Sequence, residues 1–126
     1  WKGREWIFDV AHNVAGAEFL AQRLQQAGIV PASAIFSAMA DKDLVGVFTA
    51  LAPVVTQWYL FPLQENPRAA SLEQLQAAAL QAGVNLLAIQ ICTDSHSAIH
   101  LAAEYQSVKT ELVCGSFFTV SAIREL

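Results

Sequence analysis

The chain is poor in charged residues, and it lacks the long apolar runs of membrane proteins. Its 126 residues include 7 Lys or Arg and 11 Asp or Glu, which gives a formal net charge of -4. Because no cluster of basic residues is present, the charge argues against a nucleic acid or an anionic membrane surface as the main partner. No apolar run reaches the roughly 18 residues of a spanning helix, and the first residues do not resemble a signal peptide. We therefore expect a cytoplasmic protein.

Several chemistries are disfavoured because their residues or motifs are missing. The two cysteines, Cys92 and Cys114, lie in apolar runs without a C-x-x-C partner, so buried, reduced thiols are expected rather than a disulfide or a metal site. The sequence contains neither G-x-G-x-x-G nor G-x-x-x-x-G-K-[ST], which excludes a dinucleotide fingerprint and a phosphate loop of its own. The run around Ser116 is not G-x-S-x-G, so a nucleophile elbow is unsupported. His96 and His100 are four residues apart, but with no third ligand in view, solvent-facing or packed histidines are the default over zinc.

A regular alternation of β-rich runs and helical stretches is present instead. With 55% hydrophobic residues, a chain of this length can build the core of one domain. The expected strands are 6–8, 34–39, 54–61, 86–91 and 110–114, and the expected helices are 14–27, 44–51, 72–82, 95–106 and 117–126. Strands that alternate with crossover helices predict an α/β fold with a three-layer, doubly wound, mostly parallel, Rossmann-like sheet.

Polar residues follow three of the expected strands. These exits are Asp9-Val10-Ala11-His12-Asn13, Asp41-Lys42-Asp43 and Gly115-Ser116. In parallel sheets, ligands bind beyond the carboxyl ends of the strands, so the three exits should converge on one edge. The alternative for each exit is simple helix capping, by Asp9 or Asn13, by Asp41 or Asp43, and by Ser116. The combination of an acid, an imidazole, a cation and a hydroxyl favours a ligand site.

Lys42 points to the charge of that ligand. A cation at a helix N-terminus opposes the helix macrodipole unless an anion lies nearby. An anionic ligand group would complement it. Gly115 allows the backbone to approach a ligand closely, and Ser116 then offers a hydroxyl and an N–H.

Four runs of the sequence, taken in order, resemble the C-terminal domain of folylpolyglutamate synthases, including the bifunctional bacterial dihydrofolate synthases. The runs are 9–13, 40–43, 58–59 with 67–68, and 113–120. The last domain of the Mur ligases of peptidoglycan synthesis is similar in its Asp-x-Ala-His-type turn. The resemblance covers nearly the whole chain and implies one domain, residues 1–126, of a longer chain whose N-terminal ATP-binding domain is absent. Val14 departs from the pattern, because the family usually has proline there.

The resemblance implies an ATP-dependent amide ligase that phosphorylates a folate carboxylate and lets the amino group of L-glutamate attack the acyl phosphate. Mg2+ would be bound mainly by the N-terminal domain, and the isolated C-terminal domain would be inactive. Carried over to this sequence, Asp9 and His12 would lie near the ribose and phosphates of ATP, with Asn13 in support. Lys42 and Ser116, with Arg68 as a secondary candidate, would address the glutamate carboxylate. No residue here is expected to be a catalytic nucleophile.

Two alternatives stay open from the sequence. The parent enzyme could be a Mur-type ligase acting on a peptidoglycan precursor, or the chain could be a non-catalytic module that binds a small ligand. If the parent is a folate enzyme, the sequence does not distinguish dihydrofolate synthesis from extension of polyglutamate tails.

Overall fold

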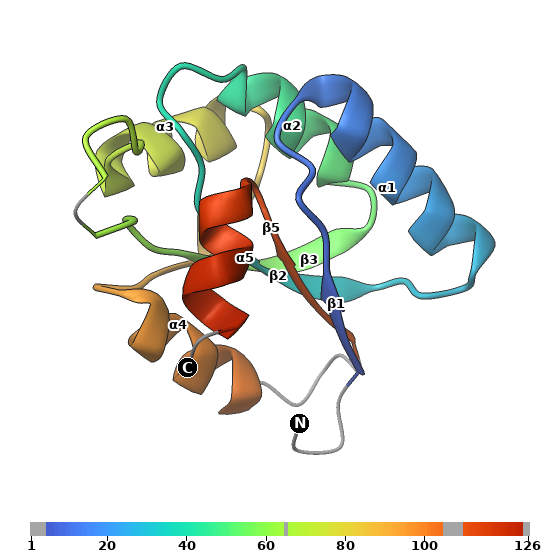
Figure 1. The fold of residues 1–126 in the computed structure, drawn as a ribbon. Helices are drawn as coiled ribbons and strands as arrows, with labels where there is room; N and C mark the ends of the chain where they lie inside the picture. The colour runs from blue at the N-terminus through green and yellow to red at the C-terminus, as the bar shows by residue number, and fades with distance from the viewer. Residues whose placement is uncertain (1–4, 65, 105–109, 125–126) are drawn as a thin grey trace.

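A five-stranded parallel sheet forms the centre of the molecule (Figure 1). The computed structural model describes residues 5–64, 66–104 and 110–124. The strands are Glu5–Phe8 (β1), Ala32–Phe36 (β2), Val55–Leu60 (β3), Ile89–Ile91 (β4) and Thr110–Cys114 (β5). They lie in the order β1-β5-β2-β3-β4, and each neighbouring pair is parallel. The last strand in the sequence is therefore inserted between the first and the second.

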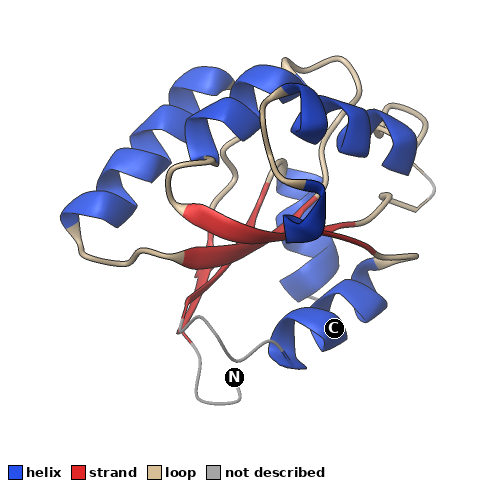
Figure 2. Cartoon of the chain, turned by 180° about the vertical axis from the view of Figure 1, so that it is seen from behind, coloured by secondary structure: helices blue, strands red, loops and turns tan. Residues whose placement is uncertain are grey.

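Five α-helices cover the two faces of this sheet (Figures 1 and 2). They are Val14–Gln26 (α1), Leu44–Leu51 (α2), Leu72–Gln81 (α3), Ser95–Glu104 (α4) and Phe117–Arg124 (α5). The first three lie on one face, and α4 and α5 lie on the other. The three-layer, doubly wound sheet predicted from the sequence is thus confirmed, and among the described strands it is parallel throughout.

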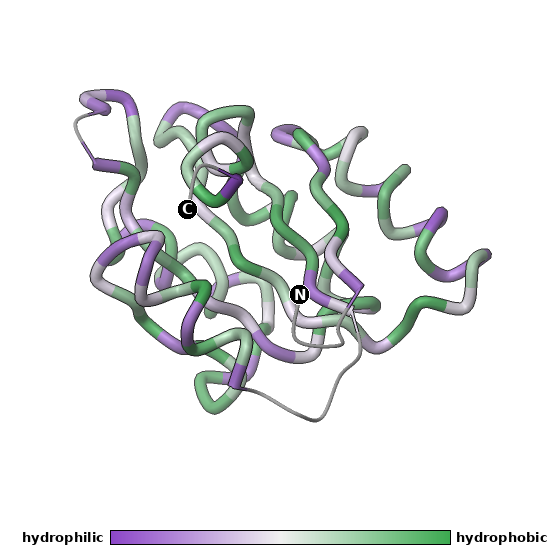
Figure 3. The backbone as a smooth tube through the Cα atoms, turned by 60° about the horizontal axis from the view of Figure 1, so that its bottom comes forward, coloured by the Kyte–Doolittle hydropathy of each residue, from purple (hydrophilic) through white to green (hydrophobic). Residues whose placement is uncertain are grey.

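Each face of the sheet has its own core, because successive strand residues point to opposite sides. Phe36 and Trp58 pack with Phe48 of α2 beneath α1–α3, with ring centroids 4.8 to 5.7 Å apart. Ile35 and Tyr59, their strand neighbours, pack instead under α4 and α5. The strands are accordingly mostly apolar along their length, and polar segments gather in the connections (Figure 3).

Local sequence signals set the ends of the helices. The side chain of Asn13 accepts a hydrogen bond from the Gly16 N–H at the start of α1, and Asp43 does the same for the Gly46 N–H at the start of α2. After α1, Gly28 has φ of 71°, and the bonds from the Gly28 N–H to the Gln25 carbonyl oxygen and from the Ile29 N–H to that of Leu24 form a Schellman motif. Capping by Asn13 and Asp43, two of the possibilities left open by the sequence, is therefore observed.

The start of α1 allows a test of the residue that departs from the family pattern. Val14 is the first residue of α1, and Asn13 before it is extended, with φ of -136° and ψ of 173°, which is the conformation that a following proline favours. We expect Val14→Pro to stabilise the chain by about 0.5 to 1 kcal/mol, because proline restricts the unfolded chain. Urea unfolding measures this change. The Val14 side chain lies close to Gly46 of α2. A loss of stability would show that its packing stabilises the fold by more than proline gains by restricting the unfolded chain.

The ends of two strands differ from those predicted from the sequence. The strand expected at 34–39 is Ala32–Phe36, because the chain leaves the sheet after Phe36 and Met39 forms an antiparallel bridge with Ala69. The strand expected at 86–91 is three residues shorter. Leu86–Ala88 form a 3-10 turn (η1), in which the Asn85 side chain accepts from the Leu87 N–H. The other elements match within one or two residues, apart from the ends expected at 105–106 and 125–126, which lie outside the described residues.

Both cysteines are buried and free, as predicted. Burial, together with the charge of Asp94, raises the pKa of the Cys92 thiol to about 11, and burial raises the pKa of Cys114 as well. Neither thiol is therefore set up as a nucleophile at neutral pH. Among the helices that the structure describes, none is both long enough and apolar enough to cross a membrane.

Candidate functional site

The three polar exits follow strands that are neighbours in the sheet. In the order β1-β5-β2, the segments after these strands leave toward different faces, because α5 covers the face opposite to α1 and α2. Such a divergence between adjacent strands opens the sheet edge where ligands bind in doubly wound folds. The convergence predicted from the sequence is thus present at the level of the strands, and hydrogen bonds join the segments that follow them.

Backbone hydrogen bonds join the exit of β1 to that of β5. The Asp9 N–H donates to the Val113 carbonyl oxygen at 3.0 Å, which extends the sheet by one residue. The Gly115 N–H then donates to the Ala11 carbonyl oxygen at 3.1 Å. The turn that carries His12 is therefore fixed against the start of α5 by main-chain contacts, independently of its side chains.

Side-chain hydroxyls join the exit of β5 to that of β2. The Thr119 hydroxyl donates to the Ser37 carbonyl oxygen at 2.6 Å, and Ser116 Oγ accepts from the Thr119 N–H at 3.0 Å. Since the single hydroxyl hydrogen of Thr119 is used in this way, Ser116 donates in the 2.9 Å contact between the two hydroxyls. All three residues are buried.

A fourth segment, the loop before α3, is fastened to the exit of β2. The Ala40 N–H donates to the Arg68 carbonyl oxygen at 2.7 Å, and the Ala70 N–H donates to the Ala38 carbonyl oxygen at 2.9 Å. The Arg68 guanidinium forms an ion pair of 2.9 Å with Asp41. Residues 9–13, 37–42, 66–70 and 115–119 therefore form one connected border at the carboxyl ends of β1, β5 and β2, here called the carboxyl rim.

The ion pair on the rim sets the protonation of Asp41. The hydrogen bond from Arg68, followed by its charge and that of Lys42, lowers the pKa of the Asp41 carboxyl below its ordinary value of 3.8. A lowered pKa in the folded state means that the pair stabilises the fold above pH 3.8, and that this contribution is lost as the pH falls through the folded value. Both side chains are exposed, so the effect on stability is small.

This pKa can be measured directly. Titration of the Asp41 side chain by NMR should give a midpoint below 3.8 in the unmodified chain, and a higher midpoint in Arg68→Gln. An unchanged Asp41 midpoint in the variant would show that Arg68 does not remain beside Asp41 in solution.

The three residues expected at ATP all lie on the exit of β1. Asp9 is half-buried, and its Oδ1 accepts from the Ala11 N–H at 2.8 Å, which leaves Oδ2 for a ligand. The exposed His12 ring contacts the Val10 carbonyl oxygen through Nδ1 at 3.1 Å, so Nε2 points away from this contact. Asn13 uses its side-chain oxygen as the cap of α1. The turn therefore presents a carboxylate oxygen and an imidazole nitrogen from a fixed backbone.

The three residues expected at glutamate differ in how they are held. Lys42 is half-buried beside the Asp41–Arg68 pair. Arg68 is exposed, and its guanidinium is oriented by Asp41. Ser116 is 4% exposed, and its hydroxyl caps α5. The cap takes the hydroxyl hydrogen and one lone pair, so less of Ser116 is left for a ligand than the sequence suggested.

Other residues that shape the rim or the helices beside it are not evident from the sequence. Thr119 and Ser37 connect β5 with β2, and Gly46 lets the first turn of α2 approach Val14 of α1, because a Cβ at Gly46 would collide with Val14 and Asp43. The glycine at position 46 was the sequence signal available for that approach. The contact between Ser37 and Thr119 spans 82 residues of sequence and has no local signature.

Cavities border the rim without enclosing it. One of about 190 Å³ lies between β1 and α1 and is lined by Asp9 and Arg23, and another of about 240 Å³ lies beside Phe118 and Gln64. Within residues 5–64, 66–104 and 110–124, His, Cys, Asp and Glu side chains do not gather in groups of three or more that could hold a metal ion.

Comparison with known proteins assigns the family. A family model described as "Mur ligase, glutamate ligase domain" matches residues 1–117. The chain belongs to this glutamate ligase domain family. Within the curated proteins, it is 36% identical over 124 residues to the dihydrofolate synthase/folylpolyglutamate synthase of Escherichia coli K12, with 95% of the chain and 27% of that protein covered.

Solved structures of folate enzymes have the same fold as this glutamate ligase domain. The bifunctional folylpolyglutamate synthase/dihydrofolate synthase of Yersinia pestis, complexed with AMPPNP and Mn, matches with a TM-score of 0.81 and 33% identity, covering 95% of the chain and 28% of that protein. A structure of a bifunctional folylpolyglutamate synthase/dihydrofolate synthase with Mn, AMPPNP and L-glutamate bound matches with a TM-score of 0.78 and 32% identity over 93% of the chain and 27% of that protein. The chain thus spans little more than a quarter of the length of these relatives.

Proposed function

We propose that this glutamate ligase domain is the C-terminal domain of an ATP-dependent folate–glutamate ligase, a dihydrofolate synthase/folylpolyglutamate synthase. The single observation that carries the proposal is the identity of 36% to the Escherichia coli enzyme over 95% of the chain. The connected rim supports it, because it offers separate acidic and cationic groups at the edge of the sheet where ligands bind. A cytoplasmic location is part of the proposal, and the two buried, free thiols support it.

The exit of β1 would hold the nucleotide. The free oxygen of Asp9 suits a ribose hydroxyl, which donates, better than a phosphate, which repels a carboxylate. His12 is exposed on the same turn, and its Nδ1–H donates to the Val10 carbonyl oxygen, so Nε2 donates to a phosphate oxygen only when the ring is doubly protonated. Asn13 supports both by capping α1, so that the turn is held in place.

The exits of β2 and β5 would hold glutamate. Lys42 provides a positive charge for a glutamate carboxylate, and the Asp41–Arg68 pair beside it fixes the segment on which it lies. Arg68 retains further N–H donors after binding Asp41. Ser116 would contribute one hydroxyl lone pair, or its backbone N–H at the start of α5.

ATP with Mg2+ would supply the phosphoryl group that activates the folate carboxylate. The residues of this chain would position glutamate and the nucleotide and stabilise their charges. Among the described residues, no three His, Cys, Asp or Glu side chains gather to bind a metal ion, so we assign Mg2+ mainly to the remaining part of the parent chain. The domain would close over the nucleotide from one side, and alone it would be inactive.

The test is made in the complete parent enzyme carrying this domain. Lys42→Ala should raise the KM for glutamate about 10- to 100-fold, because a hydrogen bond to a charged group contributes about 1.5 to 3 kcal/mol, while the KM for ATP stays nearly constant. Arg124→Ala, which removes a cation at the end of α5, is the matched control and should leave both constants unchanged. Ser116→Ala is measured alongside, with its unfolding midpoint, because loss of the cap also lowers stability. Unchanged glutamate KM in both Lys42→Ala and Ser116→Ala would refute this assignment.

The Mur-type peptidoglycan ligase is the less favoured alternative. The curated relatives in Escherichia coli and in two Buchnera strains are all dihydrofolate synthase/folylpolyglutamate synthases. Turnover of dihydropteroate or a folate by the parent enzyme, with no turnover of a peptidoglycan precursor, distinguishes the two. Isothermal titration of the chain with ATP and glutamate, alone and mixed with the remaining part, separates either ligase from a stand-alone binding module.

A further inference from the structure

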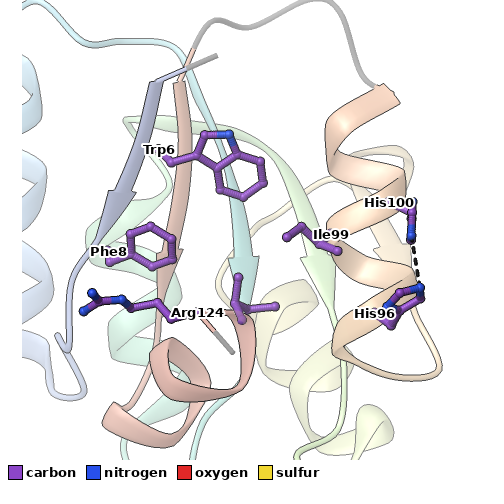
Figure 4. Close-up of a pocket in the computed structure, with 7 residues that line it drawn as sticks. Trp6, Phe8, His96, Ile99, His100 and Arg124 are labelled. Carbon is purple, nitrogen blue, oxygen red and sulfur yellow. Dashed lines mark hydrogen bonds between the residues drawn. The ribbon is translucent and has the colours of Figure 1, made fainter. Parts of the chain in front are cut away.

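Two histidines on α4 lie close together, outside the carboxyl rim. His96 and His100 are four residues apart, and their Nε2 atoms are 3.1 Å from each other. Both side chains are exposed. Figure 4 shows the two rings on the same flank of α4, joined by this contact, while Ile99 projects toward Trp6 of β1. The spacing of four residues, one helical turn, places the two rings together.

We propose that His96 and His100 form a two-histidine site for a divalent transition-metal ion such as Zn2+ or Ni2+. Imidazole nitrogens bind such ions at about 2.0 to 2.1 Å, so two ligands at a right or tetrahedral angle lie about 2.9 to 3.4 Å apart. The separation of 3.1 Å falls within that range. An ion lying off the line between the two Nε2 atoms, about 2 Å from each, would replace the hydrogen bond that joins them and would need the rings to turn toward it, and water would complete its coordination.

The surroundings of the pair set its strength and selectivity. The N-terminal turn of α4 disfavours a cation, and the Asp94 carboxylate, two residues before His96, offsets this effect. Asp94 itself is held by the Ser97 N–H at 2.8 Å, so it acts through its charge and does not need to coordinate. Two nitrogen ligands favour Zn2+ or Ni2+, and disfavour Mg2+ and Ca2+, which prefer oxygen.

A bound ion would also clamp one turn of α4. It links residues one turn apart in the folded helix and finds no such arrangement in the unfolded chain, so it should raise the unfolding temperature as its concentration increases. This readout does not depend on ligase activity. Failure of the proposed folate ligase function would leave the site untouched, and the reverse also holds.

The experiment titrates the tag-free chain, freed of metal by a chelator, with ZnCl2, NiCl2 and MgCl2. Calorimetry should show one Zn2+ or Ni2+ per chain, and thermal unfolding should shift upward by several degrees with these ions and not with Mg2+. His96→Ala and His100→Ala should each abolish both effects, and His100→Gln provides a second variant that retains a polar side chain. His12→Gln, which changes the exposed histidine of the rim, is the matched control and should bind as before.

Three results would overturn the proposal. In the first, both single alanine variants bind the metal as the unmodified chain does. In the second, His12→Gln loses metal binding while the His96 and His100 variants keep it. In the third, Mg2+ raises the unfolding temperature as much as Zn2+ or Ni2+ does. The first would show that the metal binds elsewhere. The second would show that the metal binds at the rim. The third would show that the rise in unfolding temperature comes from general charge screening.

Discussion

Gly115→Ala should destabilise the chain by about 3 kcal/mol or more. Gly115 follows β5 with φ of 118°, a conformation that costs other residues about 1 to 3 kcal/mol. In addition, a Cβ at this position would collide with the Ser37 carbonyl oxygen and crowd the Phe36 ring. Because the obstacle includes backbone, it cannot simply rotate away. The chain would have to separate the exits of β5 and β2.

Urea unfolding of Gly115→Ala measures this loss, and the chain provides matched controls. Gly28 and Gly83 also have positive φ, 71° and 92°, but a Cβ at either would meet nothing within 4 Å. Their alanine variants should lose about 1 kcal/mol, which is the conformational part alone. If all three variants lose the same amount, the close approach of Gly115 to Ser37 contributes nothing to stability.

The second large effect is expected on nucleotide use. In the parent enzyme, Asp9→Ala should raise the KM for ATP about 10- to 100-fold, because it removes a charged acceptor for a ribose hydroxyl. Asp9→Asn should fall between Asp9→Ala and the unmodified enzyme, since its amide oxygen can still accept from the Ala11 N–H and hold the turn. The KM for glutamate should change little in either variant.

The unfolding midpoint of each Asp9 variant separates binding from folding. Glu18→Ala, which removes an exposed carboxylate from α1, is the control for loss of negative charge near the β1 exit. If Asp9→Ala changes only the constant for the folate substrate, the placement of the β1 exit at ATP is wrong. If Glu18→Ala weakens ATP use as strongly as Asp9→Ala, the effect is one of overall charge rather than of the Asp9 contact.

Local chemistry made much of the fold predictable. Caps such as Asn13 and Asp43, and the glycines that end α1 and α3, act through contacts within five residues, so the sequence shows both partners at once. The buried strand Thr110–Cys114 was recognisable from its apolar run. The end of β2 could not be predicted, because Ser37 and Met39 are typical strand residues. Their partners outside the sheet, Thr119 and Ala69, are distant in the sequence.

The candidate site also has a part that the sequence predicts and a part that it does not. Which strands carry polar exits can be read from the sequence, and the parallel sheet then places those exits on one edge. The state of each side chain depends on distant partners: Asp41 holds Arg68 across 27 residues, and the Ser116 hydroxyl is engaged by Thr119 within a network that ends on Ser37. Such pairings follow from packing, for which no local pattern exists. The roles assigned to Lys42, Arg68 and Ser116 remain predictions.

The insertion of β5 between β1 and β2 has a consequence for how the domain folds during synthesis. In the described sheet, β1 pairs with β5 alone, at a separation of more than a hundred residues in sequence. While the ribosome still holds the last quarter of the chain, β1 and its turn have no neighbour to join, although β2, β3 and β4 can already associate. Pairings that distant close slowly. The part of the rim that follows β1 is thus assembled last, and a chain shortened before residue 110 would retain a partial sheet without it.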